Sequence, residues 1–250
     1  MRTAQEKVAD FVRRLKEVAG DNLESAILYG SAARGQYQAS RSDLNVLCTL
    51  KSLAAEELAR ISPVVNWWCK DEGEPAPQFF QNAELHQSAD VFAIEFLDMQ
   101  QSHKVLYGPD VISAISVPMN LHRVQVEHEL RTLLLRLRQY FLLHAENHGD
   151  LRVFSAKSSS SVRVLLRHVI MAFGEVPPED WPELSIRIAQ LTGAHAAALE
   201  TPWRWRDDLA HATEVARGYA FYMTAIAQVI EALDQKVPKS EWQRIRKRVS

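Results

Sequence analysis

The sequence is poor in cysteine: its 250 residues include only two, Cys48 and Cys69. Their spacing suits neither a disulfide framework nor a zinc site, so we expect a protein of a reducing compartment, the cytoplasm. The sequence also lacks any apolar run near the roughly 18 to 20 residues that a membrane-spanning helix requires. Its first residues show no signal-peptide pattern. We therefore expect no membrane segment and no membrane partner.

An excess of charge of one sign is also missing. The 29 basic and 31 acidic residues leave a formal net charge of -2. Such a balance creates no strong overall field that would attract nucleic acid or an anionic membrane. Apolar residues make up 47% of the chain and charged residues 24%, which is an ordinary globular composition. The length allows one large domain or two smaller ones.

The hydrophobic periodicity changes near residue 115. Before that point, apolar runs predict strands, preceded by a helix over 3–19 in which Thr3 and Glu6 form a capping box. After residue 120 the spacing is almost wholly helical. The predicted fold class is α+β, with a small sheet-containing domain over residues 1–115 and an all-α helical bundle over 120–250. The expected strands are 23–29, 43–50, 78–81 and 91–97, and the expected helices of the bundle are 121–147, 157–173, 182–192 and 208–236.

A set of polar residues is expected at the ends of these strands. The Gly30-Ser31 pair follows the first strand, and Asp43 and Asn45 lie two positions apart on the second. Because strand side chains alternate, both of these project from the same face. Glu95 lies inside the apolar run 91–97, where a carboxylate is costly unless it is paired, bound to metal or open to a cleft. Hard oxygen ligands of this kind suit a divalent cation.

The identity of the third ligand rests on its position within the run. Asp90 and Asp98 fall at the two ends of 91–97, where carboxylates more often serve as caps or solvated turn residues. Glu95 is the only one inside the run. We therefore choose Glu95 and keep the other two as alternatives.

These motifs resemble those of a known superfamily. Gly30-Ser31, then Ala33-Arg34-Gly35, then Ser42-Asp43 with Asn45 is similar to the signature of the DNA polymerase beta-like nucleotidyltransferases, which include small bacterial aminoglycoside nucleotidyltransferases. The resemblance covers residues 24–108, including Leu106-Tyr107-Gly108. It implies a mixed-sheet nucleotidyltransferase domain, followed by a helical domain, that transfers a nucleoside monophosphate from an NTP, with ATP expected, to a hydroxyl group.

The resemblance also implies roles for individual residues. Gly30 and Ser31 would contact the triphosphate, with Arg34 and Ser42 as further nucleotide contacts, although Arg34 fits a surface ion pair equally well. Asp43, Asn45 and Glu95 would hold Mg²⁺ or Mn²⁺. Asp43 and Glu95 are the catalytic candidates, Glu95 as the general base or as a metal ligand.

The sequence departs from the superfamily pattern at one position. The pattern has Asp-x-Asp, whereas this chain has Asp43-Leu44-Asn45. An amide oxygen still ligates magnesium, but it attracts a dication less strongly than a carboxylate does. Two hypotheses follow: an active magnesium-dependent nucleotidyltransferase, or a catalytically weakened nucleotide-binding module that acts through partner or self association.

The helical half offers a second candidate phosphate site. Lys157 and Ser158 lie where a helix is predicted to begin, and a helix N-terminus with a cation and hydroxyl groups attracts phosphate, although the serine run 158–161 also fits a capped loop. The acceptor is open between a small molecule, a protein and an RNA. The long apolar helix predicted over 121–147 suggests a homodimer.

Overall fold

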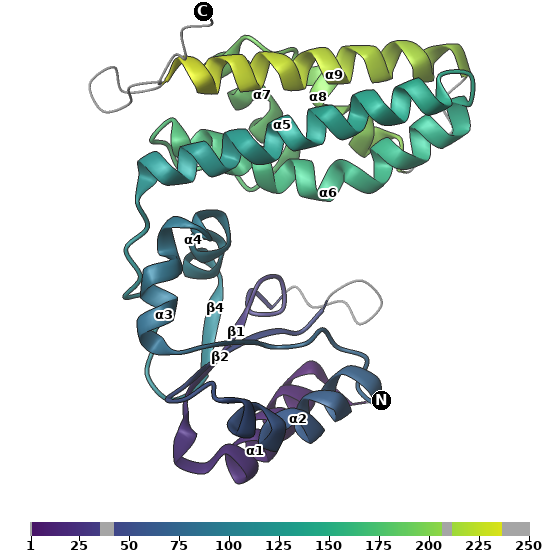
Figure 1. Ribbon diagram of the computed structural model, residues 1–250. Helices are drawn as coiled ribbons and strands as arrows, with labels where there is room; N and C mark the ends of the chain where they lie inside the picture. Colours follow the sequence, from purple (N-terminus) through teal and green to yellow (C-terminus); the bar gives the residue numbers. More distant parts are fainter. Residues whose placement is uncertain (1, 36–42, 207–211, 237–250) are drawn as a thin grey trace, which may run out of the picture. The chain divides into compact units, whose positions relative to one another are not determined.

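The computed structural model describes residues 2–35, 43–206 and 212–236. Its elements divide between two compact units, Met1–Pro118 and Met119–Ser250. The first unit holds a mixed sheet with helices, and the second is helical (Figure 1). The predicted α+β fold class is therefore confirmed. The elements of the first unit are α1 (Ala4–Ala19), a 3-10 turn (Gly20–Asn22), β1 (Leu23–Tyr29), β2 (Asn45–Leu50), α2 (Ala55–Lys70), β3 (Gln78–Phe80), α3 (Asn82–Gln87), a second 3-10 turn (Ser88–Asp90), α4 (Ala93–Gln101) and β4 (His103–Tyr107).

The sheet has the strand order β3-β2-β1-β4. β1 pairs antiparallel with both β2 and β4, whereas β2 and β3 are parallel. Helices cover both faces: α1 and α2 lie on one side, and α3 and α4 on the other (Figure 1). The central strands are therefore buried on both faces, which explains why their sequences are almost continuously apolar.

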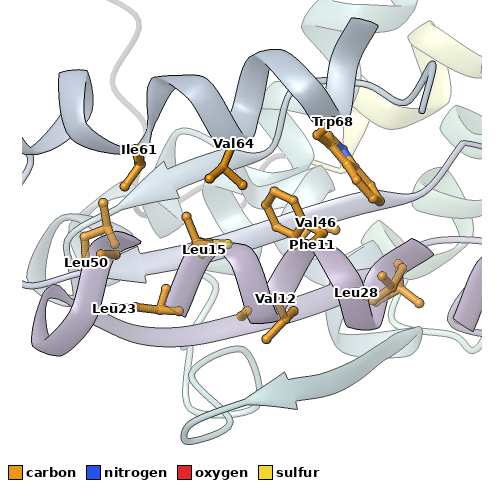
Figure 2. Close-up of a cluster of buried hydrophobic side chains, with 14 of the residues drawn as sticks. Phe11, Val12, Leu15, Leu23, Leu28, Val46, Leu50, Ile61, Val64 and Trp68 are labelled. Carbon is orange, nitrogen blue, oxygen red and sulfur yellow. The ribbon is translucent and has the colours of Figure 1, made fainter. Parts of the chain in front are cut away.

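The α1 and α2 side holds the larger of the two cores in this unit. α1 begins at the Thr3–Glu6 capping box, as predicted, and buries one stripe of side chains at helical spacing. Phe11 from this stripe packs on Trp68 of α2, with their ring centroids 4.7 Å apart (Figure 2). Alternate residues of the strands close the core from the sheet side. The buried members of this core are Val8, Phe11, Val12, Leu15, Ala19, Leu23, Ala26, Leu28, Leu44, Val46, Cys48, Leu50, Ile61, Val64 and Trp68.

The end of β4 depends on a glycine. Gly108 has a φ of +72°, and a Cβ added to it would lie 1.9 Å from the carbonyl oxygen of Glu24 on β1. Only glycine fits this close approach of two backbones. The buried Ser25 hydroxyl donates to the carbonyl oxygens of Tyr107 (3.2 Å) and Pro109 (2.8 Å), which fixes the same corner of the sheet.

The strand predicted over 91–97 is wrong: this segment leads into helix α4. Ala93, Phe96 and Met99 are buried at a spacing of three. Phe96 and Met99 belong to the same core cluster as Ile27 and Leu47 of the sheet. That spacing belongs to a helix, but a seven-residue apolar run is too short to distinguish it from a buried strand. The strand at this edge of the sheet is β4, which follows α4 and pairs with β1 on the side opposite β2.

The second unit consists of five helices within the residues described: α5 (Met119–His144), α6 (His148–Ala172), α7 (Trp181–Thr192), α8 (Ala196–Arg204) and α9 (Ala212–Gln235). α5, α6 and α9 are the long ones. A buried contact links α5 and α6, where His122 Nε2 lies 2.9 Å from His168 Nδ1. Tyr219 of α9 donates its hydroxyl to the Leu137 carbonyl oxygen at 2.9 Å. No helix among the described residues is long and apolar enough to cross a membrane.

The helix expected to begin at 157 begins earlier, at His148. Asn147 caps it, because its side chain accepts a hydrogen bond from the backbone N–H of Asp150. Lys157 and Ser158 therefore lie in the middle of α6 rather than at its N-terminus. The serines are tolerated there because their hydroxyls donate to carbonyls of the preceding turn, as Ser158 Oγ does to the Ser155 oxygen at 2.7 Å.

Candidate functional site

The glycine turn after β1 is fixed by hydrogen bonds on both sides of Gly30. Gly30 has a φ of +81°, a conformation that residues with a side chain rarely adopt. Its N–H donates to the Ser102 carbonyl oxygen (3.0 Å), and its own carbonyl oxygen accepts from Ser102 Oγ (2.8 Å) and the Ala33 N–H (3.1 Å). Residues 31–35 form turns. Ser31 is exposed at the outside of this bend.

Asn45 lies beside this turn. It is the register partner of Tyr29, the residue before Gly30. A Cβ added to Gly30 would lie 3.7 Å from Asn45 Nδ2. Leu44 is buried in the core against α1 and α2, whereas Asp43 is exposed and Asn45 half-buried. The sheet thus brings Asn45, the first residue of β2, to the glycine turn. Asp43 lies two residues before β2 and not on the strand, which was predicted to begin at 43.

A buried ion pair holds the start of β2. The N–H of Leu44 donates to Glu74 Oε2 at 3.0 Å, and Glu74 Oε1 accepts from Lys7 Nζ at 2.8 Å. Glu74 is only 8% exposed. A buried carboxylate is tolerated there because it has both a cation and a backbone donor as partners. This contact fixes the backbone between Asp43 and Asn45.

Glu95 lies on α4 and not on a strand. It is exposed and sits in the first turn of the helix. Its negative charge acts on Tyr29: burial raises the pKa of that phenol, and Glu95 raises it further. The next residue, Phe96, packs in the same core cluster as Tyr29, the residue before the glycine turn. Of the two alternatives, Asp98 is half-buried on α4 and Asp90 is exposed at the end of a 3-10 turn.

The donor chemistry at the start of β2 is compatible with magnesium. Asp43 and Asn45 supply hard oxygen atoms, and Mg²⁺ is commonly bound by one or two carboxylates together with substrate phosphates. Over residues 2–35, 43–206 and 212–236, no three His, Cys, Asp or Glu side chains come together as a metal-binding group. A site here would therefore depend on Asn45 and on oxygens from the nucleotide.

The remaining predicted site residues are spread over both units. Arg34 is exposed just after the glycine turn, and Ser42 lies outside the described residues. Lys157 is exposed and Ser158 half-buried on α6 of the helical unit. The structure therefore brings Gly30 and Asn45 together and places Glu95 on α4.

An open cavity of about 870 Å³ lies on the other face of the sheet. Residues of α1, β1 and β4 line it together with Ala32, Ala33 and Gly35 of the segment after the glycine turn. Its rim carries Lys16, whose Nζ lies 4.3 Å from the centre of the Tyr107 ring. This cavity is on the α1 side, whereas Asn45 belongs to the α4 side, so the two are separate features of the unit.

Sequence reasoning missed the residues that support the turn and the start of β2. Ser102, Glu74 and Lys7 are buried or half-buried polar groups whose partners lie 72, 30 and 67 residues away in the chain. No local pattern marks such pairs. The one available signal was Glu74 itself, a carboxylate in the Gly- and Pro-containing loop that leads back to the sheet.

Comparison with known proteins gives a result at the level of the fold. No protein-family profile matches the chain, and no curated protein matches its sequence. Among solved structures, the chain is similar to the spectinomycin adenyltransferase AAD(9) from Enterococcus faecialis, determined with ATP and spectinomycin. The TM-score is 0.51 at 13% identity, and the match covers 93% of this chain and 100% of the other. The chain therefore has a nucleotidyltransferase-like α+β fold with a C-terminal helical region.

Proposed function

We propose that this protein is a nucleotidyltransferase that moves the nucleoside monophosphate of ATP to a hydroxyl group of an acceptor. The observation that carries the proposal is the placement of Asn45 beside the positive-φ turn at Gly30, with Asp43 two residues before Asn45. The adenyltransferase that shares the fold was determined with ATP and spectinomycin. A small hydroxylated molecule is thus the first acceptor class to test, before a protein or an RNA.

The triphosphate would be bound by residues of the glycine turn and the segment after it. The backbone N–H of Ser31, next to Gly30 in the turn, would bind the triphosphate together with Arg34 and Ser42, because exposed amides and guanidinium groups are strong phosphate donors. Gly30 itself would allow the phosphates to approach the backbone closely. Lys157 and Ser158, on the helical unit, stay a separate candidate phosphate site. In α6 they would act through the Lys157 ammonium group and the Ser158 hydroxyl rather than through a helix N-terminus.

Asp43 and Asn45 would hold Mg²⁺ or Mn²⁺, with Glu95 as a further candidate ligand. A bound dication neutralises charge on the phosphates during transfer. As general base, Glu95 would accept the proton of the acceptor hydroxyl, whose oxygen then attacks the α-phosphorus while the bond to the pyrophosphate oxygen breaks. Asp90 and Asp98 remain the alternatives for this role.

A second candidate function is a nucleotide-binding module with little or no turnover, acting through partner or self association. Asn45 favours it, because the amide removes one formal negative charge from the proposed metal site. Nucleotidyl transfer depends mainly on positioning and charge neutralisation, so a weakened metal site lowers turnover more than it lowers nucleotide binding.

Label transfer distinguishes the two functions. The wild type and the Asn45→Asp variant are incubated with α-labelled ATP, Mg²⁺ or Mn²⁺ and a panel of aminoglycosides and other hydroxylated acceptors. The enzyme proposal predicts labelled product and pyrophosphate from the wild type. Label transfer by Asn45→Asp but not by the wild type identifies a weakened module. If the wild type and the variant both fail to bind nucleotide and to transfer label, both proposed functions are refuted.

A further inference from the structure

Ser102 connects the glycine turn to the helix that carries Glu95. It is 5% exposed and lies between the end of α4 and the start of β4. Its N–H donates to the Met99 carbonyl oxygen at 3.0 Å, which ends α4. Its carbonyl oxygen and its hydroxyl both bond to Gly30, at 3.0 and 2.8 Å. One buried residue thus holds the end of α4 and both peptide groups of Gly30.

These bonds orient the peptide between Gly30 and Ser31. The Gly30 carbonyl points into the protein, where it accepts from Ser102 Oγ and from the Ala33 N–H. In a planar trans peptide the N–H points opposite to the C=O. The Ser31 N–H therefore points away from Ser102. A turn fixed in this way presents its amide to a phosphate without further ordering when the ligand binds.

We propose that Ser102 is a positioning residue for nucleotide binding, acting through the Gly30 carbonyl to hold the Ser31 N–H toward the triphosphate. The inference deepens the proposed function and rests on it. Ser102 itself contacts no nucleotide in this account. Its hydroxyl matters because it keeps the turn in the binding conformation before the nucleotide arrives.

Ser25 provides a matched control. It is fully buried on β1, and its hydroxyl also donates to backbone carbonyls, those of Tyr107 and Pro109. It fixes the opposite end of β1 from Gly30. Ser25→Ala therefore removes bonds of the same kind from the same sheet without touching the turn, so it reports the effect of general loosening.

The experiment compares Ser102→Ala, Ser102→Thr and Ser25→Ala with the wild type in the full-length chain. Two quantities are measured: the Kd for ATP with Mg²⁺, and amide hydrogen exchange of the peptide covering residues 28–35. We expect Ser102→Ala to raise the Kd about tenfold, equivalent to about 1.4 kcal/mol, and to speed exchange in this peptide. Ser102→Thr, which keeps the hydroxyl, restores the affinity, and Ser25→Ala leaves both quantities unchanged.

Two results overturn the inference while leaving the proposed function intact: wild-type binding with an unchanged Kd in Ser102→Ala, or an equal loss of affinity in Ser25→Ala. A wild type that binds no nucleotide refutes the proposed function and the inference together. The two failures are therefore distinguished by the wild-type titration alone.

Discussion

Replacement of Glu74 by glutamine should loosen the start of β2. Glu74→Gln keeps the size of the side chain but removes the charge that pairs with Lys7 and weakens the acceptor for the Leu44 N–H. Breaking a fully buried ion pair costs about 3 to 5 kcal/mol. Here the cost is smaller, because the Lys7 side chain is 18% exposed and Nζ also donates to the Glu72 carbonyl oxygen at 2.8 Å. We expect a loss of about 2 kcal/mol.

Amide hydrogen exchange of the peptide covering β2 measures this loss locally. A decrease of about 2 kcal/mol in the opening free energy corresponds to exchange roughly 30-fold faster. The Lys7→Met variant removes the other partner, and the double variant Lys7→Met/Glu74→Gln should cost less than the sum of the two single changes. Additive effects, or unchanged exchange in Glu74→Gln, would refute the claim that this pair holds the strand that carries Asn45.

Three further predictions concern stability and chemistry elsewhere in the first unit. Gly108→Ala should destabilise the protein by more than about 3 kcal/mol, because the strain of a positive φ combines with the overlap of the new Cβ with the backbone of Glu24. Gly73 also has a positive φ, of +73°, but has open space around it, so Gly73→Ala should cost only about 1 to 2 kcal/mol. The urea concentrations at the unfolding midpoints of the two variants measure the difference. Hydrogen bonds from Ser113 and His103 outweigh burial and lower the pKa of the Asp110 carboxyl group. The ionised Asp110 therefore stabilises the fold above the unfolded-state pKa, near 4, and this contribution is lost as the pH falls below that value. Asp110→Asn should make the free energy of unfolding less dependent on pH in this acid range, and an unchanged dependence would contradict this assignment. Burial raises the pKa of the Cys48 thiol, so an aromatic disulfide reagent should modify Cys69 alone in the native protein and both thiols in urea. Rapid modification of both cysteines in the native protein would show that β2 is not buried.

The sequence predicted those helices and strands that are determined by residues close together in the chain. The Thr3–Glu6 capping box marks the start of α1, and the apolar runs of β1 and β2 are long and β-rich enough to identify. The fold class followed from the change in periodicity after these elements. Predictions from short sequence patterns failed where contacts between distant parts of the chain determine the secondary structure. Pro63, a residue type that usually ends or kinks a helix, lies inside α2, which runs from Ala55 to Lys70.

The candidate site shows the same division. Gly30, Asp43 and Asn45 were chosen as candidates from strand alternation and turn chemistry, which are readable from neighbouring residues. The structure places Asn45 beside Gly30, and the roles of these residues stay predictions. Glu95 was placed on the wrong kind of element, because a short apolar run fits a helix or a strand. Ser102 went unnoticed, since its importance comes from bonds to a residue 72 positions away.

The central claim is that the start of β2 and the glycine turn form a magnesium-nucleotide site. Calorimetric titration of ATP into the wild type and into Asp43→Asn, each with and without Mg²⁺, tests it most directly. Asp43 is exposed, so the substitution should leave the fold intact. We expect Mg²⁺ to tighten ATP binding to the wild type and Asp43→Asn to lose this gain. Equal magnesium-dependent affinity in both proteins, or no ATP binding by the wild type, would contradict it.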